Sequence, residues 1–68
     1  MQRVPVGSSV LASVGHARGV LEVEFRSGAV YRYVGVPEHV YVHLLNADSQ
    51  GIYFNDHIRD TYDWERVA

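Results

Sequence analysis

The most regular pattern in the chain is an alternation of apolar and charged residues in the run LEVEF, residues 21–25. Leu21, Val23 and Phe25 fall on one face of an extended chain, and the two glutamates between them fall on the other. An alternation with a period of two is typical of an antiparallel strand that buries one face. A second apolar run follows at residues 29–34, after a short segment that contains Gly28, so we predict a β-hairpin.

The length of the connecting loop decides which residues of the hairpin face each other. A two-residue loop, Ser27-Gly28, would place the Arg32 cation on the apolar face opposite Val23. A three-residue loop over residues 26–28, with Gly28 in the left-handed conformation of a glycine bulge, gives pairs that match in chemistry: Val23 with Tyr31, Leu21 with Tyr33, and Glu22 with Arg32. We predict the second register, because it places both tyrosines in the core.

The same register predicts that Glu22 and Arg32 form an ion pair on the solvent-exposed face of the sheet. We therefore expect Glu22→Arg to cost little more free energy of unfolding than one surface ion pair contributes. Tyr31→Ala should cost roughly 3 kcal/mol or more, because this register places Tyr31 in the core.

The segment SSVLASVGHARG, residues 8–19, predicts one more strand, at about Ser9–Val14, closed by a turn over Gly15–Gly19. The alternation of this segment is imperfect, because Val10 and Val14 share one face with an alanine while Leu11 lies on the other. Short connections favour neighbouring antiparallel strands, so the three strands form a meander.

After Pro37 the apolar residues recur with the spacing of a helix, and proline suits the first position of a helix. The apolar residues of this segment fall on one stripe: Val40, Tyr41, Leu44, Leu45 and Ala47. Ser49 suits the N-cap of a second helix, in which Phe54, Ile58 and Tyr62 recur at intervals of four and form one apolar ridge. We predict an α+β fold over residues 1–68: a three-stranded antiparallel β-meander with two C-terminal helices packed on one face.

Composition and charge narrow the function classes. The chain of 68 residues has no cysteine, so it has neither disulfides nor a thiolate metal site. Residues 1–34 carry a net charge of +2 and residues 35–68 a net charge of −4, which together give the total of −2. No basic stripe is present, which disfavours nonspecific binding to nucleic acid. The chain opens without a signal pattern and holds no long apolar run, so we expect a soluble, cytoplasmic protein without membrane contact.

Two groups of residues could carry catalysis. His39 and His43 lie four apart on one helix and could share a metal ion, but a zinc site needs a third ligand, which His57 or an aspartate would have to supply. Ser49, His57 and Asp60 contain the residue types of a nucleophilic triad, yet Ser49 lies about two helical turns before His57, too far for a hydrogen bond. We therefore interpret Ser49 as a cap and the histidines as surface residues, and we expect no cofactor.

Carboxylates and aromatic side chains offer two further possibilities. Acid–base chemistry could use the carboxylates of the C-terminal quarter, Asp56, Asp60, Asp63 and Glu65, but residues this polar near a chain end are usually solvated. Aromatic residues beside arginines could stack on nucleic-acid bases. Tyr31 and Tyr33 are predicted to lie in the core, whereas Tyr41, Tyr53 and Trp64 are the ones that could reach the surface.

A set of residues from about Ser8 to Arg66 forms a recognisable motif: Ser8-Ser9, Gly15, Leu21, Val23, Phe25, Gly28, Tyr31, Tyr33, Val36-Pro37, Ala47, Ser49, Gly51, Phe54-Asn55, Ile58-Arg59 and Tyr62. In this combination the chain resembles the KTSC domain family. Two features depart from the family pattern. His16 replaces an aromatic residue expected after Gly15, and Asp63, Trp64 and Glu65 stand where the family often has a proline and a basic ending.

The resemblance implies a role near RNA or translation, since the family is named for its occurrence at the C-terminus of some lysyl-tRNA synthetases and also occurs as short stand-alone proteins. It directs attention to Ser49, Gly51, Asn55 and Arg59, which belong to the shared motif. Gly51 would allow the second helix to pack closely on the first. Arg59 could lie along the apolar surface and present its guanidinium to an anion.

We interpret the chain as a noncatalytic binding module with RNA or a translation protein as its partner and Ser49, Tyr53, Asn55 and Arg59 as its contact surface. Two alternatives remain open. The first is a small hydrolase or metal-dependent enzyme that uses His39, His43 and His57. The second is a scaffold or oligomerisation domain, which an uncovered apolar patch would indicate.

Overall fold

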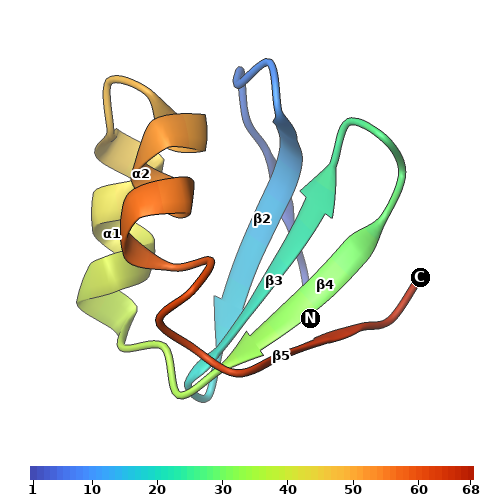
Figure 1. Cartoon of the computed structure of the whole chain (residues 1–68), viewed down its shortest axis with the longest axis vertical. Helices are drawn as coiled ribbons and strands as arrows, with labels where there is room; N and C mark the ends of the chain where they lie inside the picture. The colour runs from blue at the N-terminus through green and yellow to red at the C-terminus, as the bar shows by residue number, and fades with distance from the viewer.

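A five-stranded antiparallel sheet with both helices on one side makes up the computed structural model, which describes all residues 1–68 (Figure 1). The strands lie in the sheet in chain order. The elements are β1 (Val4–Pro5), β2 (Leu11–Ala17), β3 (Val20–Phe25), β4 (Val30–Val34), α1 (Glu38–Asn46), α2 (Gln50–His57) and β5 (Trp64–Arg66). The predicted α+β class is confirmed. The predicted strand number of three is wrong, and the helices are not C-terminal, because β5 follows them.

The β3–β4 hairpin has the predicted register. Leu21 pairs with Tyr33, Glu22 with Arg32 and Val23 with Tyr31. Gly28 takes a φ of +98°, and its N–H donates to the Phe25 carbonyl, which closes the three-residue loop. The hairpin is therefore specified locally, since its pattern of faces, its opposed charges and its glycine all require the same register.

The first predicted strand starts and ends later than its sequence pattern suggested. Leu11 pairs with Phe25 and Ser13 with Glu24, so the ladder contains a β-bulge around Ala12. The extra residue restores Leu11 and Val14 to the same face, and both are fully buried. The strand continues through Gly15 and His16, and the turn is confined to Arg18 and Gly19, both at positive φ.

The two edge strands, β1 and β5, were not predicted. β1 has two residues and pairs Val4 with Val14, and β5 has three residues and pairs Trp64 with Tyr33. Gly15 makes room for the N-terminal segment, because a Cβ at this position would lie 2.6 Å from the Gln2 carbonyl oxygen. All residues of both edge strands are exposed.

The helices cover the sheet with the predicted apolar positions, and neither helix is long and apolar enough to cross a membrane. Val40 and Leu44 of α1 and Phe54 of α2 are buried. Ile58 is fully buried just after α2, whereas Tyr62 lies beyond the helix in a turn and is half-buried. The inward ridge is therefore confirmed for Phe54 and Ile58, but it does not continue as helix to Tyr62.

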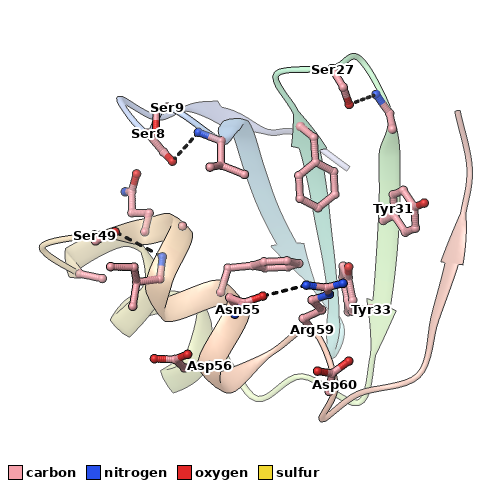
Figure 2. A pocket seen from close by; sticks show the side chains of 18 of the residues that line it. Ser8, Ser9, Ser27, Tyr31, Tyr33, Ser49, Asn55, Asp56, Arg59 and Asp60 are labelled. Atoms are coloured by element: carbon pink, nitrogen blue, oxygen red, sulfur yellow. Dashed lines mark hydrogen bonds between the residues drawn. The ribbon is translucent and has the colours of Figure 1, made fainter.

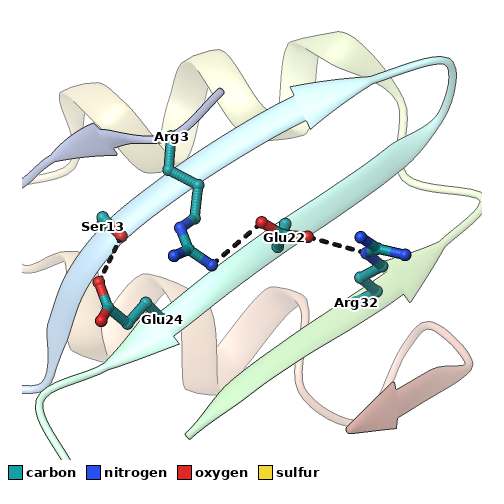
Figure 3. A network of polar contacts seen from close by, with 5 residues as sticks. All are labelled: Arg3, Ser13, Glu22, Glu24 and Arg32. Atoms are coloured by element: carbon teal, nitrogen blue, oxygen red, sulfur yellow. Dashed lines mark hydrogen bonds and ion pairs between the residues drawn. The ribbon is translucent and has the colours of Figure 1, made fainter. Parts of the chain in front are cut away.

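The opposite face of the sheet carries a polar cluster centred on Glu22 (Figure 3). Its carboxylate accepts from Arg32 Nε at 2.8 Å and from Arg3 Nη1 at 3.0 Å, and its side chain is only 9% exposed. The Arg32 hydrogen bond and the charges of both guanidinium groups hold the pKa of Glu22 below its usual value, against the effect of burial. The predicted Glu22–Arg32 pair is confirmed, but the expected solvent exposure of Glu22 is wrong.

Candidate functional site

A groove of about 1390 Å³ runs between α2 and the inner face of β3 and β4 (Figure 2). Its volume exceeds the roughly 300–1,000 Å³ of typical small-molecule pockets. Three loops also line the groove: the loop before β2, the β3–β4 loop and the α1–α2 connection. The lining residues are Gly7, Ser8, Ser9, Val10, Phe25, Ser27, Ala29, Tyr31, Tyr33, Ala47, Asp48, Ser49, Gln50, Gly51, Ile52, Phe54, Asn55, Asp56, Arg59, Asp60 and Trp64.

Aromatic rings form the floor of the groove. Phe54 packs edge-on against Phe25 and Tyr33, with ring centroids 5.4 Å apart in both pairs. Tyr31 continues the row, 5.6 Å from Phe25 and 5.1 Å from Trp64. Tyr33 is buried as predicted, whereas Tyr31 is only half-buried and Trp64 is 56% exposed. The aromatic row thus begins in the core and ends at the surface.

Two serines build the walls at the N-terminal ends of β2 and α2. The Ser8 hydroxyl accepts from the N–H groups of Val10 and Leu11, which fixes the loop before β2. The Ser49 hydroxyl accepts from the Ile52 N–H at 3.3 Å and caps α2, as predicted. Both hydroxyls therefore have a structural role beside their place in the groove.

The cap at Ser49 yields a stability prediction. Ser49→Ala should lower the free energy of unfolding by about 1 kcal/mol, because one N–H of the first turn of α2 loses its acceptor. Urea denaturation followed by circular dichroism measures this change. Ser9→Ala is the matched control, since Ser9 is exposed and lies in the same groove, and it should change stability by less than about 0.5 kcal/mol. Equal losses for both variants would contradict the capping role.

Asn55 of α2 and Arg59, which lies in the turn just after α2, are side by side at the groove (Figure 2). The Asn55 side-chain oxygen accepts from Arg59 Nη1 at 3.0 Å, and this bond orients the guanidinium. The guanidinium has no carboxylate partner, because both ion pairs of the molecule belong to Glu22. Its remaining N–H groups are free to donate to a ligand in the groove.

Burial, together with the neighbouring Tyr31, raises the pKa of Tyr33 to about 12, although the positive charge of Arg59 opposes the shift. The Tyr33 hydroxyl therefore stays protonated throughout the physiological range and remains a hydrogen-bond donor. Asp60 also contributes to the shift. The charges of Arg59 and Asp60 thus both act on the same end of the groove.

The structure brings together three of the four predicted contact residues. Ser49, Asn55 and Arg59 all line the groove. Tyr53 does not line it. Its ring lies between His43 and His57, at centroid distances of 6.5 and 4.5 Å. Tyr53 therefore lies apart from the other three residues, and its part in binding stays a prediction.

Gly51 lines the groove, but the expected reason for its small size is wrong. A Cβ at this position would approach Val10 Cγ2 at 3.4 Å and the Ser8 hydroxyl oxygen at 3.8 Å, and none of the three atoms nearest to it belongs to α1. These separations are ordinary van der Waals contacts. Close packing between the two helices does not account for this glycine.

The candidate catalytic sets are not assembled. His39 and His43 are neighbours, with ring centroids 5.9 Å apart, but no group of three histidine, cysteine or acidic side chains converges as a metal site would require. In the proposed triad, Ser49 and Asp60 line the groove while His57 packs on Tyr53 outside it. Asp56 and Asp60 lie at the groove rim, whereas Asp63 and Glu65 do not line it.

Sequence reasoning overlooked the part of the groove that comes from distant segments. Val10 lines the wall opposite α2, and Phe25 lies in the floor. His16 also has contacts that the sequence did not predict: it stacks on Tyr41 at 5.4 Å, and its Nε2 lies 2.7 Å from the Val36 carbonyl oxygen. His16 therefore packs on α1 with its ring, as an aromatic side chain would.

Comparisons with known proteins cover almost the whole chain. Residues 7–62 match the model of the KTSC domain. An uncharacterized protein of Stutzerimonas stutzeri strain A1501 is 53% identical over 57 residues, which is 81% of this chain and 80% of that one. A lysine–tRNA ligase of Nostoc punctiforme is 42% identical over 48 residues, 71% of this chain but 9% of the ligase. The crystal structure of a KTSC domain protein from Yersinia pestis superposes with a TM-score of 0.94 at 33% identity, over 98% of this chain and 97% of that one.

Proposed function

The chain belongs to the KTSC domain family, and from this premise we propose that it is a noncatalytic binding module associated with translation, with the groove between α2 and the sheet as its binding surface. The relation to a region of lysine–tRNA ligases supports the association with translation. A small domain that recurs both inside a ligase and as a short separate chain is more consistent with a binding role than with a step of one reaction.

The observation that carries this proposal is the place of the polar motif residues. The motif contains five polar residues without an aromatic ring, Ser8, Ser9, Ser49, Asn55 and Arg59, and all five line the groove. Ser8 and Ser49 bond to backbone groups, whereas Asn55 and Arg59 bond only to each other. An exposed pair without a structural role in the fold is best explained by binding.

An amide chemical-shift titration tests the groove as the binding surface. The probes are purified 70S ribosomes at substoichiometric amounts, total tRNA, and zinc chloride. We expect line broadening or shifts from a translation component at residues of α2 and β4 that line the groove, and no change with zinc. Zinc-dependent shifts at His39 and His43 would instead support the metal-enzyme alternative.

A pair of matched arginine variants strengthens this test. Arg59→Gln should weaken the interaction at least fivefold, because the N–H groups of Arg59 that Asn55 leaves free are the hydrogen-bond donors that this arginine offers a partner in the groove. Arg18→Gln is the control, since Arg18 lies in the β2–β3 turn outside the groove and is exposed as well. Equal effects of both variants would mean that binding depends on overall charge, and the groove would no longer be supported as the site.

A further inference from the structure

Large apolar side chains are exposed to solvent along the rim of the groove. Three of its rim side chains are large, apolar and open to solvent: Val10 at 48%, Ile52 at 64% and Trp64 at 56% exposure. They surround the half-buried Tyr31 and Phe25 of the floor. Apolar side chains that gather around an aromatic floor mark an interaction site. An occupant that buries them must carry at least one large apolar group.

The charge of the groove is negative. Asp48, Asp56 and Asp60 line it, all three are exposed, and none is in an ion pair. Arg59 is the single cation among the lining residues. Figure 2 shows Asp60 beside Arg59 and Asp56 farther away on α2. Three carboxylates against one guanidinium attract cations and repel a chain of phosphates.

We propose that the groove receives an extended polypeptide segment in which a large apolar side chain is flanked by lysine or arginine residues. The apolar side chain lies on the row formed by Phe25, Tyr31 and Trp64. The basic residues on either side meet the carboxylates of the rim. This inference rests on the proposed function, since it names the kind of partner that the groove binds.

The proposal reconciles an acidic groove with a role in translation. Proteins that bind RNA carry basic segments, because they must neutralise phosphates. A domain with an acidic, aromatic groove is complementary to such a segment and not to the RNA itself. Single-stranded RNA is the alternative occupant, in which bases would stack on Trp64 and Tyr31 and a phosphate would meet Arg59.

The experiment compares three probes of similar length by Trp64 fluorescence, which reports on the groove because Trp64 is the only tryptophan of the chain. The first probe is a capped peptide of sequence Gly-Lys-Lys-Leu-Phe-Lys-Lys-Gly. The second has glutamate in place of each lysine, and the third is octauridylate. We expect the lysine peptide to bind at least tenfold more tightly than either other probe, with an affinity that falls as salt is raised.

Two variants test the role of the rim carboxylates. The double variant Asp56→Asn, Asp60→Asn should weaken binding of the lysine peptide at least fivefold, whereas Asp63→Asn, which changes an exposed carboxylate outside the groove, should leave it unchanged.

The outcomes distinguish this inference from the proposed function. If octauridylate binds in the groove and the lysine peptide does not, the inference about the partner is wrong while the groove remains a binding surface. If the two peptides bind equally, the carboxylates do not select the partner and the inference also fails. If ribosomes and tRNA perturb only residues outside the groove, the proposed binding surface itself is wrong.

Discussion

Phe54→Ala is expected to remove about 3–5 kcal/mol from the free energy of unfolding, the range measured for truncating a buried phenylalanine. Phe54 is 5% exposed and packs edge-on between Phe25 and Tyr33. It is the residue through which α2 contacts the aromatic row of the sheet. Its loss would leave a cavity and remove two favourable ring contacts.

This loss is large compared with the total stability of so small a domain. A chain of 68 residues has a total stability of about 3–10 kcal/mol at the usual 0.05–0.15 kcal/mol per residue. Phe54→Ala should therefore lose a large fraction of its stability and melt well below the wild type, which circular dichroism and thermal melting measure. Phe54→Leu keeps most of the volume, so it should stay folded with a loss of about 1–2 kcal/mol.

Ile52→Ala provides the matched control. Ile52 is an apolar residue of the same helix but is 64% exposed, so its truncation should change stability by less than about 0.5 kcal/mol. Similar losses at positions 52 and 54 would contradict the assignment of faces in α2. A small loss at Phe54 alone would mean that α2 contributes little to the core.

Local patterns explain what the sequence predicted well. The β3–β4 register followed from the alternation of faces, the position of Gly28 and the opposition of Glu22 to Arg32, all within 14 residues. The start of α2 followed from Ser49, whose cap is present. These features depend on neighbours in the chain, which is why the sequence alone was sufficient.

The features that the sequence failed to predict depend on very short segments or on contacts between segments that lie far apart in the chain. The bulge in β2 interrupts the period of two, so the strand was read with the wrong bounds. β1 contains only two residues, one of them Pro5, and has no period to detect. The site was predicted in part, since the side of the groove formed by Val10 and Phe25 depends on tertiary packing that no local pattern encodes.

The placement of Tyr53 could have been predicted correctly. Residues advance by 100° around a helix, so Tyr53 lies about 160° from Asn55, whereas Arg59 lies about 40° from Asn55. The spacing alone thus separates Tyr53 from the Asn55–Arg59 pair. The structure agrees, because Tyr53 contacts His43 and His57 on another face.

The largest electrostatic effect is expected for Glu22→Arg, which the sequence suggested would be mild. The structure shows the Glu22 side chain 9% exposed between Arg3 and Arg32, which are 28% and 45% exposed. Reversing its charge removes two ion pairs and places three guanidinium groups together. Solvent screens the two partners in part, so we expect a loss of about 3 kcal/mol, measured by urea denaturation.

Glu65→Arg is the control for charge reversal. Glu65 is exposed on the edge strand β5 and forms no ion pair, so its reversal should cost less than about 1 kcal/mol. The prediction for Glu22 depends on Arg3, which directly precedes β1, a strand that was not predicted from the sequence. A loss below about 1 kcal/mol for Glu22→Arg would mean that the polar cluster is solvated and that the original expectation was correct.

The pH dependence of Glu22→Gln tests the same cluster without a repulsive charge. The hydrogen bond from Arg32 and the charges of both arginines lower the pKa of Glu22 in the folded state from the ordinary value of 4.5. A lowered carboxyl pKa contributes stability that is present above the pKa of the unfolded chain and is lost as the pH falls through the folded value. The wild type should therefore exceed Glu22→Gln by about 1–3 kcal/mol at pH 7. This difference should shrink progressively as the pH falls below about 4.5. A difference that stays constant down to pH 2 would show that the Glu22 carboxylate is not stabilised by its two arginines.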